Sequence, residues 1–130
     1  LGLASEYPTP LALDESVVSG SDVNLWLDRG WPGLFVLKPA LLGDPAAILE
    51  RLSRAKARVV FSSALETAVG ARAALQLAFS HSNKNERLAL GFGVWPLFRD
   101  GRLDGPTLAP FIREQDVAAI DEEAAWNALG

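Results

Sequence analysis

Short runs of apolar residues recur along the chain at regular intervals. They cover 11–13, 34–37, 59–61 and 88–90, and none of them alternates polar with apolar residues. Continuous apolar runs of this length are typical of strands buried on both faces, as in a parallel sheet. The first three runs are followed by Asp14, Lys38 and Ser62, each 24 residues after the one before. One strand–helix unit has about this length.

Helix signals fill the intervals between these runs. Asp44 can cap a helix whose first position is Pro45, and the apolar residues of 45–56 then share one stripe. Ser63 and Glu66 have the spacing of a capping box, which predicts a helix that starts at residue 63 and continues to 79. The other predicted elements are helices at 22–28 and 121–129, a strand at 115–120, a polar loop at 81–87 and an irregular segment at 94–110.

The order of these elements is characteristic of an α/β fold. Strands that alternate with helices form a parallel sheet with right-handed crossovers. Four strands are enough for a small open sheet or for half of an eight-stranded barrel. In both arrangements the chemistry lies at the carboxyl ends of the strands. The polar or flexible residues at these ends are Asp14, Lys38, Ser62, Ser63 and Gly91.

The composition narrows the possible functions. The chain has 130 residues, of which 49% are hydrophobic, and a formal net charge of −4. These values indicate one globular domain and argue against nucleic-acid binding, which requires clustered basic side chains. No apolar run is long enough to span a membrane, and the first ten residues lack the features of a signal peptide, so a cytoplasmic location fits best. Without cysteine, disulfides and thiolate metal sites are excluded.

The chain also contains no methionine, and its first residue is Leu1. A complete gene product of this size ordinarily has at least one methionine. We therefore expect the chain to be a fragment or a processed piece of a longer protein.

Two charged groups at strand ends are candidates for chemistry. Asp14 and Glu15 can form a solvated acidic turn, or Asp14 can be one of the carboxylates that hold a Mg²⁺ ion. Lys38 can mark the point where its strand reaches solvent. Alternatively, desolvation lowers the pKa of the Lys38 amine and makes it an acid–base group, or the amine serves as a fixed cation. Pro39 favours an extended backbone at Lys38 and thereby directs its side chain.

Small residues at the other strand ends are candidates for substrate binding. Ser63 has a structural role available, as the cap that pairs with Glu66. A helix that starts at the end of a strand also binds anions, so a substrate carboxylate can share the amides around Ser62 and Ser63. Gly91 does not belong to a complete dinucleotide-binding motif, but a glycine at a strand end lets a ligand approach the backbone.

Four segments, taken together, resemble the C-terminal half of the enolase-superfamily barrel. They are LALDES at 11–16, VLKPALLGD at 36–44, VVFSSALETAVG at 59–70 and ALGFG at 89–93. In their order and spacing they are most similar to the o-succinylbenzoate synthase family. The resemblance implies an α/β chain from a TIM-type (β/α) barrel. Residues 1–113 would supply its last four strands, and 114–130 would be a tail that packs on an absent N-terminal capping domain.

The resemblance also implies an activity and roles for the candidate residues. The family reaction is a Mg²⁺-dependent syn-dehydration that forms 2-succinylbenzoate in menaquinone and phylloquinone biosynthesis. Asp14 would be the third of three carboxylates on Mg²⁺, and Lys38 would be the second active-site lysine, which stabilises an anionic intermediate. Ser62, Ser63 and Gly91 would line the pocket around the succinyl chain of the small-molecule carboxylate substrate.

Parts of the family pattern have no counterpart in the chain. The Lys-x-Lys of the second strand, two metal carboxylates and the capping region are missing. We therefore expect the chain alone to be inactive, and to associate with the missing N-terminal half or with another copy of itself. Two alternatives stay open: an N-succinylamino acid racemase or dipeptide epimerase of the same superfamily, and a non-enzymatic receiver-like signalling domain, which also has a Lys-Pro pair at a strand end.

Overall fold

A computed structural model describes residues 2–81, 88–107 and 111–130 of the chain. Their contacts divide the chain into two units, Leu1–Ser62 and Ser63–Gly130, which we call the N-terminal unit and the C-terminal unit. The N-terminal unit contains a parallel sheet with helices, whereas the regular elements of the C-terminal unit are helical. None of the helices in the described ranges is long and apolar enough to cross a membrane.

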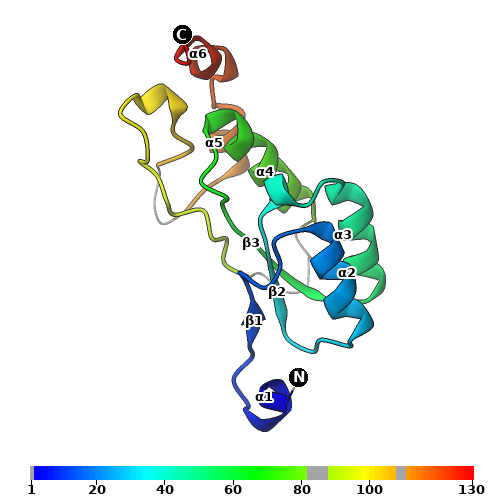
Figure 1. The fold of residues 1–130 in the computed structure, drawn as a ribbon. Helices are drawn as coiled ribbons and strands as arrows, with labels where there is room; N and C mark the ends of the chain where they lie inside the picture. Colours follow the sequence, from blue (N-terminus) through cyan, green and yellow to red (C-terminus); the bar gives the residue numbers. More distant parts are fainter. Residues whose placement is uncertain (1, 82–87, 108–110) are drawn as a thin grey trace. The chain divides into compact units, whose positions relative to one another are not determined.

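Three parallel strands form the sheet of the N-terminal unit (Figure 1). The strands, in their order across the sheet, are β1 (Ala12–Leu13), β2 (Leu34–Leu37) and β3 (Arg58–Phe61). Leu13 of β1 pairs with Phe35, and Leu37 at the end of β2 pairs with Phe61. Three of the four predicted strands and their parallel arrangement are thereby confirmed.

The strand predicted at 88–90 is wrong. These three residues have no regular structure, and none of them is fully buried. The next residue, Gly91, accepts a hydrogen bond at its carbonyl from the Ser63 N–H, with 3.1 Å between N and O. An apolar run becomes a strand only when a neighbouring edge supplies a hydrogen-bond ladder, and hydrophobicity along the chain does not show whether one does.

Helical segments follow β1 and β2 in the N-terminal unit. They are α2 (Gly20–Asp28), the 3-10 helix η1 (Pro39–Leu41) and α3 (Pro45–Arg54), while α1 (Gly2–Glu6) precedes the sheet. Ser19 caps α2 by accepting from the Asp22 N–H, so this helix begins at Gly20, two residues before the predicted start. Asp44 caps α3 as predicted, with 3.1 Å between its Oδ1 and the Ala47 nitrogen. α2 and α3 contact each other and lie side by side in Figure 1.

Within 63–81, 88–107 and 111–130, the C-terminal unit contains four helical segments. They are α4 (Ala68–His81), the 3-10 helix η2 (Gly101–Leu103), α5 (Glu114–Ala118) and α6 (Glu122–Asn127). The strand predicted at 115–120 is wrong, because α5 occupies most of this segment. The Asp116 carboxylate accepts a hydrogen bond from the Arg113 N–H at 2.7 Å, an interaction that favours a helix start. α6 confirms the predicted last helix and is capped by Asp121.

Two further predictions for this unit need correction. α4 begins at Ala68 and not at Ser63, because the residues before it form a turn around Glu66. His81 is the last residue of α4 rather than the first of a polar loop, and the rest of that loop, 82–87, lies outside the described residues. The irregular segment predicted at 94–110 is confirmed from 94 to 107 apart from the short turn of η2, and 108–110 lie outside the described residues.

The two faces of the sheet are covered to different degrees. Side chains alternate between the faces along a strand, and paired residues on neighbouring strands point to the same face. Phe35, Leu37 and Phe61 therefore share one face, and all three are at most 3% exposed. The opposite face carries Leu34 and Val36, which are only half-buried. The expectation that the strands are buried on both faces is thus met on one face only; the other face, which we call the open face, is apolar and half-buried.

The end of α3 offers a test of the local backbone. Lys56 follows the helix with a left-handed backbone, φ 53°, and its side chain is exposed. The substitution Lys56→Gly should raise the free energy of unfolding by about 0.5 to 1 kcal/mol, because glycine adopts this conformation without the steric cost of a Cβ. Lys56→Ala is the control and should give no such gain. Urea denaturation measures both, and an equal gain in the alanine variant would contradict this explanation.

Candidate active site

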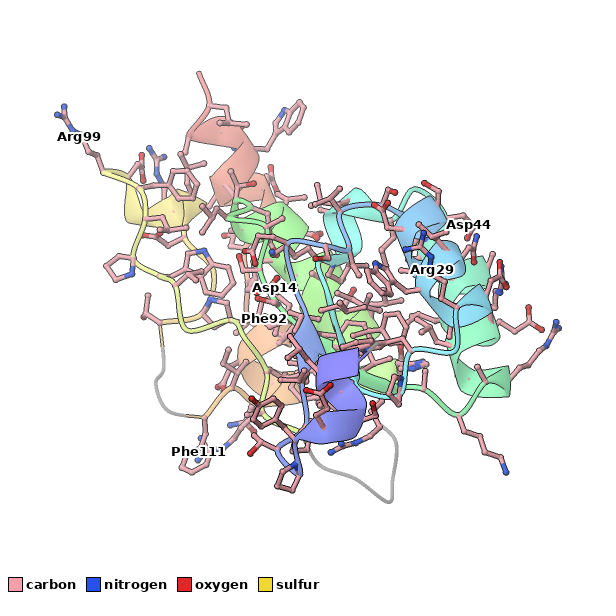
Figure 2. All side chains as sticks on the ribbon, turned by 60° about the horizontal axis from the view of Figure 1, so that its bottom comes forward. Asp14, Arg29, Asp44, Phe92, Arg99 and Phe111 are labelled. Carbon is pink, nitrogen blue, oxygen red and sulfur yellow. The ribbon has the colours of Figure 1, made fainter. Side chains whose placement is uncertain are left out.

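An ion pair joins the ends of β1 and β2 in the N-terminal unit. The Lys38 Nζ lies 2.6 Å from Asp14 Oδ1 and 3.5 Å from Glu15 Oε1. The Lys38 side chain is 18% exposed, while that of Asp14, labelled in Figure 2, is 43% exposed. The sequence places these groups 24 residues apart, and the structure brings them into direct contact. The prediction that Asp14 and Lys38 lie at the same end of the sheet is confirmed.

The strand register explains how this contact forms. Leu13 pairs with Phe35, so Asp14 comes next to Val36 in register and Lys38 lies two residues further along its strand. A lysine side chain is long enough to span this offset of about 7 Å. Asp14 and Lys38 both fall on the open face of the sheet, the face of Val36, because side chains alternate along a strand. The backbone of Lys38 is extended, as Pro39 predicts, with φ −106° and ψ 97°.

The ion pair determines the protonation of Lys38. The hydrogen bond that the Lys38 amine donates to Asp14 raises the pKa of Lys38 above its ordinary value, and the charges of Asp14 and Glu15 act in the same direction. Burial acts in the opposite direction but is the weaker influence. The alternative in which desolvation lowers this pKa is therefore wrong for the described structure. Lys38 is a fixed cation at neutral pH.

Ser62 lies beside Lys38 in the same unit. Its N–H donates to the Leu37 carbonyl at 2.8 Å, which continues the ladder of β2 and β3 by one residue. Ser62 is half-buried, and the alternation places it on the open face together with Asp14 and Lys38. The structure therefore groups three of the five predicted site residues on one face, at the carboxyl ends of the strands.

Ser63 and Gly91 belong to the C-terminal unit and are joined there by the hydrogen bond from Ser63 N–H to the Gly91 carbonyl. Ser63 is 6% exposed. Its hydroxyl donates to Glu66 Oε2 at 2.8 Å and accepts from the Leu65 N–H at 2.8 Å. The expectation that a helix start at Ser63 offers its amides to an anion is wrong, because α4 starts later and these groups are bonded within the loop.

The Asp14 carboxylate is the candidate ligand for a metal ion. Carboxylate oxygens are the donors that Mg²⁺ prefers, and Asp14 presents such a group at a strand end. Within 2–81, 88–107 and 111–130, however, no three His, Cys, Asp or Glu side chains are grouped so that they could hold a metal ion. Asp14 therefore fits as one carboxylate ligand of a Mg²⁺ ion.

Sequence reasoning missed the role of one residue, Glu66. It was assigned to a helix cap, but Glu66 precedes α4 and holds a turn that is not helical. The available signal was the close match of Ser63-Ala64-Leu65-Glu66 to a capping box. That pattern correctly predicts a contact between Ser63 and Glu66, but it does not show where the helix begins.

Comparison with known proteins identifies relatives of the chain. It is 49% identical over 96 residues to the o-succinylbenzoate synthase of Thermosynechococcus vestitus, a match that covers 72% of the chain and 29% of the relative. The o-succinylbenzoate synthases of Mycobacterium bovis and Mycobacterium tuberculosis are 36% identical over 91 residues, which is 70% of the chain and 28% of each relative. The chain is homologous to part of o-succinylbenzoate synthase. No family model matches it.

A solved structure agrees with this relationship. The crystal structure of o-succinylbenzoate synthase from Thermosynechococcus elongatus, complexed with Mg in the active site, matches 72% of the chain with a TM-score of 0.63 and 49% identity. The match covers 29% of that protein, so the chain spans less than a third of the o-succinylbenzoate synthases to which it is similar. The resemblance to this family within the enolase superfamily is thereby confirmed.

The ion pair predicts a measurable change when Asp14 loses its charge. Asp14→Asn should lower the pKa of the Lys38 amine toward its ordinary value of 10.5, because the charged hydrogen bond is lost. NMR titration of the lysine side chains measures this. A raised pKa in the folded state stabilises the protein below pH 10.5, and this contribution is lost as the pH rises through the folded value. Asp44→Asn, at the cap of α3, is the control and should leave Lys38 unchanged; an unchanged Lys38 in Asp14→Asn would contradict the assignment.

Proposed function

We propose that the chain is the C-terminal part of the barrel of an o-succinylbenzoate synthase and carries one side of its active site. The observation that carries this proposal is the Asp14–Lys38 ion pair, which lies at the carboxyl ends of parallel strands within a chain 49% identical to such an enzyme. In (β/α) barrels the active site is built at this end of the strands. β1, β2 and β3 would be consecutive strands of the second half of that barrel.

The proposed reaction is the dehydration that forms 2-succinylbenzoate. Bound Mg²⁺ would supply positive charge for the substrate carboxylate, and Asp14 would be the ligand that this chain contributes. Lys38 would stabilise the negative charge that develops on the substrate when a proton is removed. Its position at the carboxyl end of β2, on the same face of the sheet as Asp14, supports this role. The base itself would come from outside the chain.

Three further residues would bind the substrate. By resemblance to the family, Ser62, Ser63 and Gly91 correspond to residues around the succinyl chain. Ser62 has support from its place on the same open face as Lys38. Ser63 is buried and its hydroxyl is engaged with Glu66, so its contribution would come from the shape of the loop rather than from a free hydroxyl.

The remainder of the enzyme would be the partner of this chain. The half-buried apolar face of the sheet, with Leu34 and Val36, has the character of an interior barrel face that lacks its opposite side. Large apolar side chains in the C-terminal unit are also exposed: Phe111 at 73% (Figure 2), Trp126 at 69% and Leu129 at 64%. We propose that 114–130 packs on the N-terminal capping domain. Association with a second copy of the chain is the alternative, and the cytoplasm is the proposed location.

The other candidate functions gain no support. A racemase or epimerase of this superfamily requires both lysines to exchange protons with the substrate, and no described feature favours that reaction. A receiver-like domain is not favoured by any described feature, and the relatives in Thermosynechococcus and Mycobacterium are o-succinylbenzoate synthases.

The proposed role of Lys38 can be tested by substitution in the complete enzyme. Lys38→Ala should reduce kcat for the formation of 2-succinylbenzoate about 10²- to 10³-fold, because an electrostatic stabiliser of the transition state is lost. Lys56→Ala, which changes an exposed lysine after α3, is the matched control and should retain activity. Near wild-type kcat in Lys38→Ala would show that Lys38 only ends its strand.

The chain on its own should show the consequences of the incomplete site. It should bind Mg²⁺ weakly and form no 2-succinylbenzoate, since Asp14 alone leaves the ion with most of its water. It should also self-associate through its open apolar face. Isothermal titration with Mg²⁺, a dehydration assay and sedimentation velocity measure these properties. A stable monomer with dehydratase activity would contradict the proposal that the chain is part of a barrel.

A further inference from the structure

The loop that opens the C-terminal unit is folded around one carboxylate. Glu66 Oε2 accepts hydrogen bonds from the Ser63 hydroxyl at 2.8 Å and from the Ala64 N–H at 2.6 Å. The Ser63 oxygen in turn accepts from the Leu65 N–H at 2.8 Å. The Ser63 hydroxyl and the Ala64 N–H therefore donate to Glu66, and the Leu65 N–H donates to the Ser63 hydroxyl oxygen.

One oxygen of the Glu66 carboxylate is buried, although the residue as a whole is half-buried. Glu66 Oε1 is buried and has no hydrogen-bond partner among the residues that the structure describes. Gly70, in the first turn of α4, leaves space for the Glu66 side chain, because a Cβ built at Gly70 would lie 2.8 Å from the Glu66 Cβ. Hydrogen bonds to a charged group are stronger in such a low-dielectric setting than in water.

The loop also holds a backbone conformation that needs support. Leu65 has a φ of 64°, in the left-handed region, which costs about 1 to 2 kcal/mol for a residue with a Cβ. Strained residues persist where the surrounding interactions determine the conformation. The bonds from Ser63 and Ala64 to Glu66 flank Leu65 and supply this constraint.

We infer that Glu66 is a positioning residue for substrate binding: its carboxylate fixes Ser63 and, through the Ser63 amide, the Gly91 backbone. This inference rests on the proposed function, in which Ser63 and Gly91 border the succinyl carboxylate. The Ser63 N–H to Gly91 carbonyl bond is the link between the loop and Gly91. Glu66 does not bind the substrate carboxylate itself, since two carboxylates repel each other. Glu66 is an internal anion that takes the donors of Ser63 and Ala64.

This arrangement predicts a specific kinetic effect in the complete enzyme. Glu66→Ala should raise KM about 10-fold or more while kcat changes little, because the loop loses two charge-assisted hydrogen bonds and the substrate loses its preformed contacts. Glu66→Gln should retain most of the affinity, since its amide oxygen can still accept from Ala64. Added formate should lower the KM of Glu66→Ala, because it can fill the vacated anion position. Glu50→Ala, at an exposed carboxylate of α3, is the matched control and should have no effect.

A second measurement does not depend on activity. Amide hydrogen exchange of the chain should become faster at Ala64 and Leu65 in Glu66→Ala, and formate should slow it again. Gly70→Ala, which keeps the carboxylate but crowds it, should accelerate the same two amides.

The outcomes separate this inference from the proposed function. Faster exchange together with a raised KM that formate lowers supports the inference. Unchanged exchange in Glu66→Ala would overturn it, and so would faster exchange with an unchanged KM, since Glu66 would then serve only the stability of the loop. A complete wild-type enzyme that forms no 2-succinylbenzoate, with Ala64 still protected in the chain, would instead overturn the proposed function.

Discussion

The parallel register of β1, β2 and β3 is the constraint on which the candidate site depends. Parallel strands all end at the same edge of a sheet, so residues that follow consecutive strands gather there although many residues separate them in sequence. In this chain the register places Asp14, Lys38 and Ser62 on one face at that edge. The same register leaves Phe35 and Leu37 on the opposite face, where they are fully buried and anchor the strands.

The charge of Lys38 follows from this arrangement. A partly buried ammonium group is unfavourable alone, but Asp14 at 2.6 Å more than offsets the effect of burial on its pKa. Lys38 therefore stays a cation at the carboxyl end of β2, and its direct partner Asp14 is the carboxylate suited to Mg²⁺. Within the proposed function, the chain contributes a cation and one metal ligand, and the rest of the enzyme contributes the base.

Much of the N-terminal unit could be predicted from the sequence. Three strands were located by apolar runs that end in polar residues, and the start of α3 was located by Asp44 and Pro45. Both signals depend only on residues that are neighbours in the sequence. The position of Asp14 and Lys38 at the same end of the sheet followed from the parallel order, whereas their direct contact was not predicted. The open face of the sheet could not be predicted from the apolar runs alone. Such runs indicate that a strand can be buried, but they do not show whether another part of the chain covers it.

The errors lie where the outcome depends on partners distant in sequence or on competing local bonds. Residues 88–90 are apolar but form no strand, and 115–120 was assigned to a strand although the Arg113–Asp116 bond favours a helix. Ser63 matches a helix cap, yet its bonds with Glu66 and Leu65 form a separate turn before α4. Hydrophobic periodicity does not report which of two hydrogen-bonding arrangements is the more stable.

The central claim is that this chain completes the active site of an o-succinylbenzoate synthase. The most direct test combines the purified chain with the part of the Thermosynechococcus vestitus enzyme that it does not match, and measures Mg²⁺-dependent formation of 2-succinylbenzoate. The account predicts that the two parts associate and regain activity, and that the Lys38→Ala chain associates without restoring it. A stable complex that remains inactive, or one in which Lys38→Ala restores activity as well as the wild-type chain does, would contradict the account.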